Sequence, residues 1–315
     1  MKEIGGFFGL EYIKNQEYHS KAIKLNSARY SIEYILRSRK YKKIYIPYYS
    51  DDSLLQPALN TNIQFEFYNI NKEFEPIITK EILPDEVVLI INYFGLISDK
   101  LELMAKKYKN VIIDNTQAFF VKPLENIDTV YSPRKFLGVS DGGYLYSTCN
   151  YIKLKKDVSF DRYKYILKRT DLSASSAYED FIANEKVLDS LSILEMSNLT
   201  KALLSSFDYE LIKKKRETNF YILHEIFNKV NEIKIPNTLL ENGPMIYPLL
   251  LKNNIKEFLI EKKIYIPTYW KDARKRVSAN TFEAYLSENL LPLPIDQRYS
   301  KEEMLYMANL INKRL

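Results

Sequence analysis

The sequence predicts an α/β protein with a mostly parallel central sheet and a smaller α+β domain at its C-terminal end. Short apolar segments alternate with helix-like segments over the first two-thirds of the chain, the pattern of a parallel sheet with helical connections. A helix-like stretch without Pro or Gly then fills 178–230. The 315 residues are enough for two domains, so we expect a large domain over 1–210 and a small one over 211–315.

The elements of the large domain follow from periodicity and composition. Ser27–Arg39 reads as a helix, because Ile32, Ile35 and Leu36 recur at helical spacing after a Ser-Ala start. The run EVVLIIN at 86–92 is continuously apolar, as expected of a strand buried on both faces. The other elements expected here are strands at 43–49, 63–69, 111–114, 128–132 and 143–147, with helices at 53–59 and 99–108.

The small domain is indicated by weaker signals. Apolar segments at 245–251 and 264–267 and a final helix at 301–315 suggest a compact α+β unit. The long helix-like stretch at 178–230 would be the spine that leads into it.

Charge and composition limit the kinds of partner and site to expect. The net charge of +6 is spread along the chain in short runs such as Lys213–Arg216 and Lys271–Arg276, whereas nucleic-acid binders concentrate theirs on one face. We therefore expect no nucleic-acid partner and a mildly cationic pocket for a phosphorylated substrate. Cys149 is the single cysteine, so an internal disulfide is impossible and a cytoplasmic location is expected. No apolar run reaches about 18 residues, so we expect no membrane partner; two histidines and one cysteine also argue against a metal site.

Polar side chains stand where three of the predicted strands end. Asn92, Asp114 and Ser132 each end or directly follow an apolar strand. Ligands of parallel α/β sheets bind at the carboxyl ends of the strands. These three residues are therefore the first candidates for a binding site.

Four motifs occur in a fixed order: SARYS at 27–31, INYFG at 91–95, IIDNTQAF at 112–119 and YSPRKFLGVSDGGYLYS at 131–147. Together with the closing LPLP at 291–294 before SKEE at 300–303, they resemble the DegT/DnrJ/EryC1/StrS family of sugar aminotransferases. The resemblance covers nearly the whole chain. It implies the aspartate-aminotransferase fold (fold type I) and pyridoxal 5'-phosphate (PLP) as the cofactor.

The resemblance implies two catalytic residues. Lys135 would hold the cofactor as a Schiff base and move the proton between substrate and cofactor, and Asp114 would pair with the pyridinium nitrogen. The alternative from the residues alone is that Lys135 is a surface lysine and Asp114 a turn or helix-capping residue. The flanking SPR and GVSDGG segments favour the functional interpretation of the lysine.

The remaining cofactor contacts implied by the resemblance are spread over three motifs. Gln117 would lie against the ring or its 3-oxygen. The backbone N–H groups of Ser27, Ala28 and Arg29 would bind the phosphate at a helix N-terminus, where Ser27 could also be an ordinary cap. Ser132 would add a hydroxyl to the phosphate. Asn92 is a further candidate, in the space beside the ring.

Several positions depart from the family pattern. The spacer between Ser132 and Lys135 is short, and Asp51 stands where the family has the aromatic residue that stacks on the ring. Tyr48, Tyr49 and Asn92 are open candidates for that place. The family often takes a phosphate contact from the neighbouring subunit through an Asn just ahead of the position of Arg169, and no Asn stands there in this sequence. Trp270 and Arg298 could line a substrate cleft, or be a buried Trp and a solvated Arg.

The function implied is transfer of an amino group, with glutamate as the expected donor, to a nucleotide-linked keto-sugar that feeds a surface polysaccharide or glycoconjugate. A homodimer is expected. The alternatives are a catalytically idle PLP-binding relative that acts as a partner or sensor, and a PLP-dependent sugar dehydratase, in which histidine would replace Lys135. A glycosyltransferase with Asp51-Asp52 as a metal-binding pair is weaker, because this pair precedes a helix as a cap would.

Overall fold

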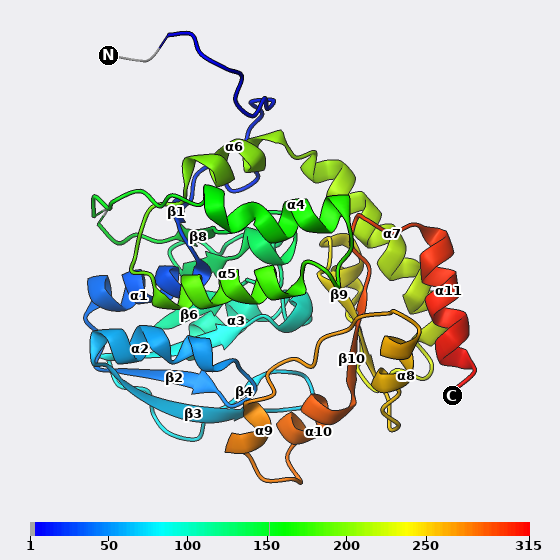
Figure 1. Ribbon diagram of the computed structural model, residues 1–315. Coiled ribbons are helices and arrows are strands. Elements are labelled where there is room, and N and C mark those ends of the chain that lie inside the picture. Colours follow the sequence, from blue (N-terminus) through cyan, green and yellow to red (C-terminus); the bar gives the residue numbers. More distant parts are fainter. Residues whose placement is uncertain (1–3, 151) are drawn as a thin grey trace.

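The computed structural model describes residues 4–150 and 152–315, and its centre is an eight-stranded sheet of order β1-β8-β7-β6-β5-β2-β3-β4 (Figure 1). In chain order the strands are β1 Ile23–Leu25, β2 Lys43–Pro47, β3 Gln64–Ile70, β4 Pro76–Ile77, β5 Glu86–Ile91, β6 Val111–Asp114, β7 Asp128–Tyr131 and β8 Gly143–Tyr146. The pairs β2–β3, β2–β5, β5–β6 and β6–β7 are parallel. The predicted strands of the first two-thirds of the chain are thereby confirmed, within a few residues at their ends.

Strand β8 reverses the direction of the chain at one side of the sheet. It is antiparallel both to β7 and to β1, so β1 runs in the same direction as β7 and the other parallel strands. The carboxyl ends of β1, β7, β6, β5 and β2 therefore meet at one edge. Helix α1, Ala28–Arg39, starts at this edge directly after β1.

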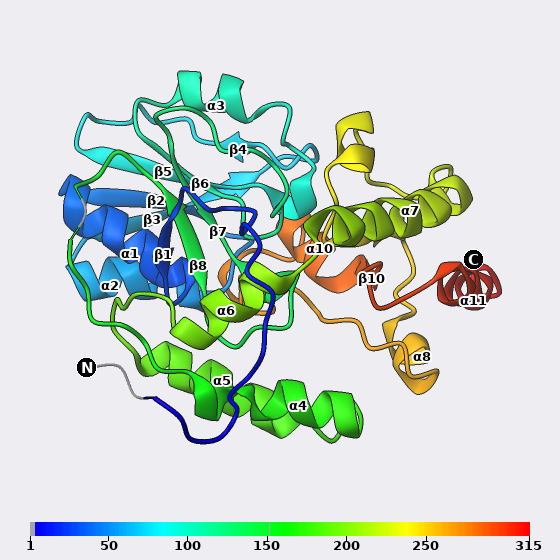
Figure 2. The same cartoon turned by 90° about the horizontal axis from the view of Figure 1, so that it is seen from above.

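Two faces of the sheet carry separate cores, because successive residues of a strand point to opposite sides. Ile44, Ile46 and Leu89 belong to the core covered by α1 and by α2, Gln56–Thr61. Tyr45, Val88 and Ile90 belong to the larger core on the other face, where α3, Leu101–Lys107, packs. Figure 2 shows the sheet between these layers.

The connection to the C-terminal region consists of four helices. They are α4 Lys164–Asp171, α5 Tyr178–Ser190, α6 Asn198–Ser206 and α7 Tyr209–Phe227. The prediction of one helical stretch over 178–230 was wrong, because the segment between α5 and α6 is extended: Glu195 bridges to Leu25 and to Lys156. Side-chain caps then start the next two helices, Ser197 at α6 and Asp208 at α7.

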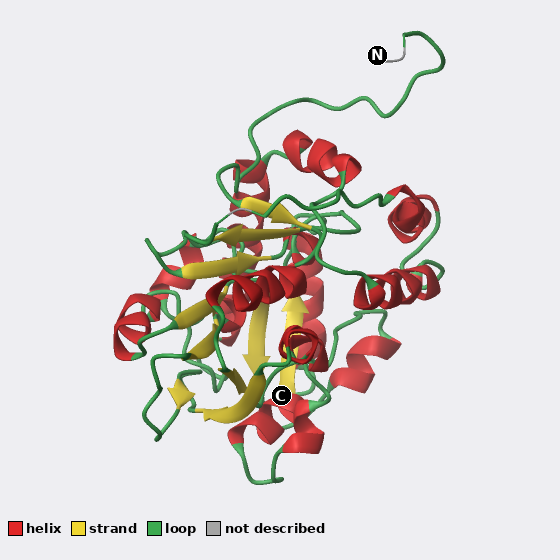
Figure 3. Ribbon diagram, turned by 90° about the vertical axis from the view of Figure 1, so that its left-hand side faces the viewer, coloured by secondary structure: helices red, strands yellow, loops and turns green. Residues whose placement is uncertain are grey.

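The C-terminal region combines a two-stranded antiparallel sheet with short helices. The strands are β9 Ile246–Leu250 and β10 Leu290–Pro294, and the helices are α8 Lys256–Glu261, α9 Ala273–Arg276, α10 Phe282–Asn289 and α11 Lys301–Asn312. The segment 264–267 is irregular rather than a strand; its place in the sheet is taken by β10, whose two prolines obscured it. Figure 1 shows β9 and β10 to the right of the large sheet, and Figure 3 shows the strands of both sheets in yellow among the helices. The division into domains at residue 210 stays a prediction; α7 starts at Tyr209.

A buried histidine lies inside the larger core behind β7 and β8. The His19 ring is enclosed by Tyr131, Tyr144 and Phe119, and its Nε2 is 2.8 Å from the carbonyl oxygen of Phe119. Burial lowers the pKa of His19 to about 4, although the contact with that carbonyl opposes the shift. The ring is therefore neutral at pH 7.

No helix in the described part of the chain is long and apolar enough to cross a membrane.

Candidate active site

The site is built at the sheet edge where the parallel strands end. Asp114 is the last residue of β6, and the backbone N–H of Asn92, just beyond β5, donates to its carbonyl oxygen at 3.0 Å. Ser132 directly follows β7 and is buried. The three strand-end residues singled out in the sequence are thus brought to neighbouring positions, as the parallel pairing requires.

Lys135 reaches this edge through a tight turn. Pro133–Lys135 is a single turn of 3₁₀ helix, with Ser132 at its N-cap position. In a 3₁₀ helix residues three apart lie nearly above one another. The short spacer that departs from the family pattern therefore places Ser132 and Lys135 on the same side of the turn.

The ammonium group of Lys135 is held by a hydroxyl, and no ion pair joins it to another described residue. Its Nζ donates to Thr116 Oγ1 at 2.9 Å. The backbone N–H of Thr116 in turn donates to Asp114 Oδ1 at 2.8 Å. Two hydrogen bonds therefore connect the lysine, through Thr116, to the aspartate twenty-one positions earlier in the chain.

The Lys135 side chain is accessible to solvent and yet surrounded by dense protein. This combination is typical of a side chain at the bottom of a concave surface. Loss of hydration lowers the pKa of the Lys135 ammonium, while the negative charges of Asp114 and Asp51 act in the opposite direction. A lysine with a lowered pKa has more of the unprotonated amine that a carbonyl group requires.

Gln117 is buried and carries an unused donor. Its Oε1 accepts from the backbone N–H of Phe94 at 3.0 Å, and no partner of its Nε2 is found among the described residues. Asn92 is different, because both ends of its amide are used inside the loop: Nδ2 donates to Ser98 Oγ at 3.0 Å and to Asn115 Oδ1 at 2.9 Å, and Oδ1 accepts from the N–H of Ile97. A cofactor contact of either residue stays a prediction.

The start of α1 lies against the beginning of β8. A Cβ at Gly143 would lie 2.3 Å from the carbonyl carbon of Ser27 and 2.5 Å from the nitrogen of Ala28, so only glycine allows this approach. Ser27 is the N-cap of α1, and its Oγ accepts from the N–H of Tyr30 at 3.4 Å. The N–H groups of the first turn thus stand at the same edge as Lys135.

Two arginines, Arg29 and Arg134, lie under helix α5, near the start of α1 and the lysine turn. Arg29 pairs with Asp189 and donates to Gln56 Oε1 at 3.0 Å, and Arg134 pairs with Glu185. The two carboxylates are one helical turn apart on α5, so the arginines lie under the same helix. The Nε atoms of Arg29 and Arg134 are buried and have no hydrogen-bond partner in the part of the chain that the structure describes.

These residues fit a phosphorylated aldehyde such as PLP. Buried donors without a partner are costly unless a ligand satisfies them, and a helix N-terminus next to two arginines suits a phosphate group. An accessible amine with a lowered pKa suits the aldehyde. Lys135, Asp114, Gln117, Ser27, Ala28, Arg29 and Ser132 all lie at or beside this edge of the sheet.

An aromatic cluster forms one side of the edge. Tyr49 stacks on Tyr93 with ring centroids 5.7 Å apart, and Trp270 from the C-terminal region meets both rings edge-on. The Tyr49 hydroxyl is buried without a partner. Tyr48 instead stacks on Phe67, outside this cluster, and Asp51 caps a short helix through the N–H of Ser53. Which residue stacks on a cofactor ring stays open.

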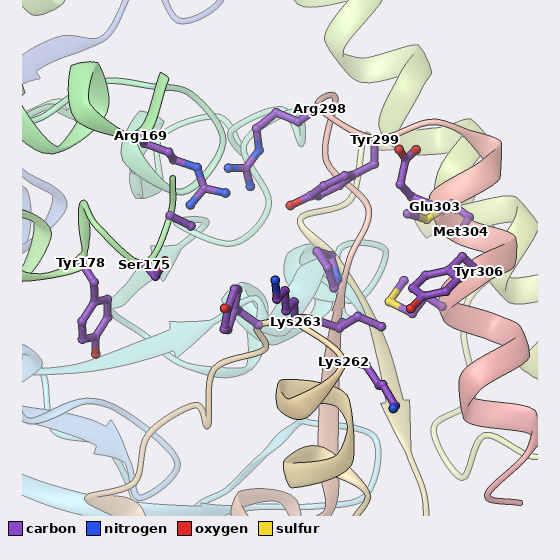
Figure 4. A pocket seen from close by; sticks show the side chains of 15 residues that line it. Arg169, Ser175, Tyr178, Lys262, Lys263, Arg298, Tyr299, Glu303, Met304 and Tyr306 are labelled. Carbon is purple, nitrogen blue, oxygen red and sulfur yellow. The ribbon is translucent and has the colours of Figure 1, made fainter. Parts of the chain in front are cut away.

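A cavity of about 660 Å³ lies between the α4–α5 segment and the C-terminal region. Figure 4 shows the guanidinium groups of Arg169 and Arg298 pointing toward one another from opposite walls. Arg298 also pairs with Asp296, Nε to Oδ1 at 2.6 Å. The cavity is lined by four cations, one acid, four tyrosines and six smaller or apolar residues: Arg169, Lys262, Lys263 and Arg298; Glu303; Tyr178, Tyr265, Tyr299 and Tyr306; Ala174, Ser175, Ile264, Pro294, Met304 and Met307.

The sequence indicated Arg298 and Trp270 as possible cleft residues; Arg298 lines this cavity and Trp270 does not, and the other residues that meet there were missed. Thr116, which holds Lys135, was missed as well. The Asp-Asn-Thr-Gln motif contains this Thr and so gave a signal for that contact. The cavity, in contrast, brings together residues up to about 130 positions apart in the sequence, so no local sequence pattern indicates it.

Comparison with known proteins supports the fold. No family model and no curated protein matches the sequence. Among solved structures, the chain is similar to the putative sugar aminotransferase Spr1654 from Streptococcus pneumoniae in its apo form, with a TM-score of 0.64 and 14% sequence identity over 93% of this chain and 85% of that one. It is also similar to Helicobacter pylori PseC, an aminotransferase of pseudoaminic acid biosynthesis, with a TM-score of 0.64 and 16% identity over 93% and 86% of the two chains.

A third similar structure is a DegT DnrJ EryC1 StrS aminotransferase from Brucella abortus, with a TM-score of 0.63 and 12% identity over 93% and 85% of the two chains. Spr1654 was also solved in PLP and PMP forms. The fold predicted from the motifs, fold type I with a mostly parallel sheet, is thereby confirmed. At these identities the likeness establishes the fold, and the chemistry has to be argued from the site.

Proposed function

We propose that this protein is a PLP-dependent aminotransferase that acts on a nucleotide-linked keto-sugar. The observation that carries the proposal is the placement of Lys135: it is accessible, has a lowered pKa and is joined through Thr116 to Asp114 at the carboxyl edge of the sheet. This arrangement occurs on a fold shared with sugar aminotransferases.

Each residue of the edge has a role toward the cofactor. Lys135 would hold the cofactor through its aldehyde and move a proton at its Nζ, and Asp114 would favour the protonated form of the ring nitrogen. Ser27, Ala28 and Arg29 would hold the phosphate through the first turn of α1, Ser132 would add its hydroxyl, and Gln117 and Asn92 would contact the ring. PLP itself supplies the electron sink for the bond changes at the substrate carbon.

The cavity lined by Arg169 and Arg298 supports a nucleotide-linked substrate. Four cations against one carboxylate favour an anionic group such as a diphosphate. The tyrosines offer faces on which a base can stack. Because Arg298 and Arg169 come from opposite walls, a diphosphate between them would bridge the large sheet's helices and the C-terminal region. The proposed amino donor is glutamate, and the product would feed a surface polysaccharide or glycoconjugate.

We further propose a homodimer. Ile4, Phe7 and Phe8 are 97%, 98% and 93% exposed in the single chain, and Leu167 and Leu172 at α4 are exposed as well. Apolar groups of this size are rarely left in water, and a second copy that covers them would explain their exposure. Sedimentation at several protein concentrations tests this. The cytoplasmic location stays a prediction.

Cofactor addition tests the central proposal. The purified protein should turn yellow with PLP, and borohydride followed by peptide mass spectrometry should place the label on Lys135. Lys135→Ala should lose the visible band, while Lys106→Ala, on the exposed side of α3, should keep it. A Lys135→Ala variant with an unchanged band would refute the site.

Turnover separates the functional classes. An aminotransferase should lose its band with glutamate and regain it with a keto-sugar nucleotide. A PLP-binding partner or sensor would bind the cofactor without turnover, and a dehydratase would release water from the sugar without consuming glutamate. Arg169→Ala should raise the KM for the nucleotide sugar about tenfold and leave that for glutamate unchanged.

A further inference from the structure

Arg216 is a fully buried arginine close to the lysine turn. It lies on α7 with 2% of its surface exposed, whereas arginines are almost never fully buried unless their charge is satisfied. Among the described residues no ion pair joins it to a carboxylate. Its interactions are with neutral acceptors instead.

Four of those acceptors come from three separate segments. Arg216 Nη2 donates to the carbonyl oxygen of Phe136 at 3.1 Å, and Nη1 donates to the carbonyls of Pro244 at 3.2 Å and Met245 at 3.1 Å. Nε donates to Gln297 Oε1 at 3.0 Å. The guanidinium also lies over the Phe136 ring, 4.6 Å from its centroid.

Gln297 closes this network. Its Nε2 donates to the same Phe136 carbonyl at 2.9 Å, so that carbonyl accepts two hydrogen bonds from the C-terminal half of the chain. Phe136 is the residue next to Lys135 in the chain. The peptide group between Phe136 and Leu137, the second one after the lysine, is therefore fixed by Arg216 and Gln297 together.

The same network holds one wall of the cavity. Gln297 stands next to Arg298, and Asn219, one turn further along α7, donates to the carbonyls of Ile295 and Tyr299 at 3.1 Å each. Arg298 and Tyr299 line the cavity. One face of α7 thus fixes both the lysine turn and the segment 295–299.

We propose that Arg216 is a positioning residue that, with Gln297, clamps the lysine turn to the C-terminal region and so sets the position of Lys135 relative to the substrate cavity. The inference rests on the proposed function for its meaning in catalysis, but the clamp itself is a property of the chain without cofactor. Arg216 makes four hydrogen bonds to neutral acceptors and one cation–π contact, so its guanidinium is held in a single position. These contacts lead to the residue beside the lysine and to the residue beside Arg298.

The charge of the clamp is stable over the working pH range. Burial lowers the pKa of Arg216 to about 10; Asp296 opposes this shift, Arg298 adds to it, and Tyr269 is the other ionisable group that faces the guanidinium. The arginine therefore stays protonated at neutral pH and keeps its donors.

Lysine reactivity without cofactor tests the clamp directly. Apo-protein is reductively methylated with formaldehyde over a pH series, and the rate at Lys135 is measured by mass spectrometry. Arg216→Met frees the turn, so the midpoint of the rate profile should move toward that of an ordinary lysine, and the rate near neutral pH should fall several-fold. The affinity of Arg216→Met for PLP should fall about tenfold. In the PLP-loaded variant, kcat should fall by a larger factor than KM changes, because a small displacement of a reacting group lowers the rate.

A second variant avoids the risk of misfolding. Gln297→Glu keeps an acceptor for Arg216 and removes the second donor to Phe136, so it should weaken PLP binding about threefold without loss of thermal stability. Arg39→Met is the matched control: Arg39 makes three hydrogen bonds to Asp128 and Thr148 at the opposite edge of the sheet. It should lose stability and leave the Lys135 profile unchanged.

The outcomes are distinct. If folded Arg216→Met and Gln297→Glu both match Arg39→Met in the Lys135 profile and in PLP affinity, the clamp is refuted and Arg216 is only structural. If the wild-type protein does not bind PLP, the proposed function fails, while the methylation profile still decides on the clamp.

Discussion

The protonation of His19 should make the unfolding free energy of the apo-protein depend on pH in a range where most carboxylates do not titrate. The buried ring has a pKa of about 4 in the folded chain against the ordinary value of 6.5. A basic group whose pKa is lowered by folding does not reduce the free energy of unfolding at pH values above its unfolded pKa, because it is neutral in both states there. As pH falls below that value, the unfolded chain takes up a proton that the folded chain refuses, so stability is lost between pH 6.5 and about 4.

The magnitude follows from these two values. The shift corresponds to about 3 kcal/mol once pH lies below both, and between about pH 7.5 and 5.5 the linkage relation gives a loss of about 1.3 kcal/mol. Most Asp and Glu side chains titrate below this interval, so the loss there belongs mainly to histidine. The sequence contains only two, His19 and His224.

Urea denaturation at the two pH values measures the effect. His19→Gln keeps a neutral donor toward the Phe119 carbonyl and cannot titrate, so its unfolding free energy should change by less than about 0.5 kcal/mol over the same interval. His224→Gln is the control and should retain most of the wild-type dependence. An equal pH dependence in His19→Gln and in the wild-type protein would refute the buried, neutral state of His19.

Three further outcomes follow from the site. Gly143→Ala forces a Cβ against Ser27 and should cost about 1–3 kcal/mol and weaken PLP binding, whereas Gly138→Ala, whose Cβ would meet its nearest neighbour at 3.9 Å, should be nearly neutral; urea denaturation compares them. Thr116→Val removes the hydrogen bond to Lys135 and should weaken PLP binding about three- to tenfold by absorbance titration, while Thr116→Ser should match the wild-type protein. Asp114→Asn should retain the yellow PLP complex and lower kcat by at least about a hundredfold in the glutamate half-reaction; an unchanged kcat would contradict its role beside the ring.

Most of the large sheet could be predicted because its signals are local. The run 86–92 and the segment 111–114 are apolar without interruption, and a parallel sheet covered on both faces requires such strands. The end of each strand then fixed where Asn92, Asp114 and Ser132 had to lie. The lysine was found through motif order, and the structure brings it to the same edge.

The parts that were missed depend on distant segments. Lys213–Arg216 was counted only as a short basic run, but Arg216 is buried, since the carbonyls that satisfy it belong to residues 136, 244 and 245. Strand β10 was hidden because prolines argue against a central strand; they fit here because each strand of a two-stranded sheet is an edge strand. The break between α5 and α6 contains no Pro or Gly, and its extended form comes from contacts with Leu25 and Lys156.

The pairing of β1 with β8 has a consequence for how the molecule is made. Ile23 lies opposite Leu145, so more than a hundred residues must be synthesised before the first strand has its neighbour. Closing so long a loop is slow compared with forming local contacts. The start of α1, which we propose as a phosphate site, is therefore completed late during translation, and β1 stays unpaired in a nascent chain that has not reached β8.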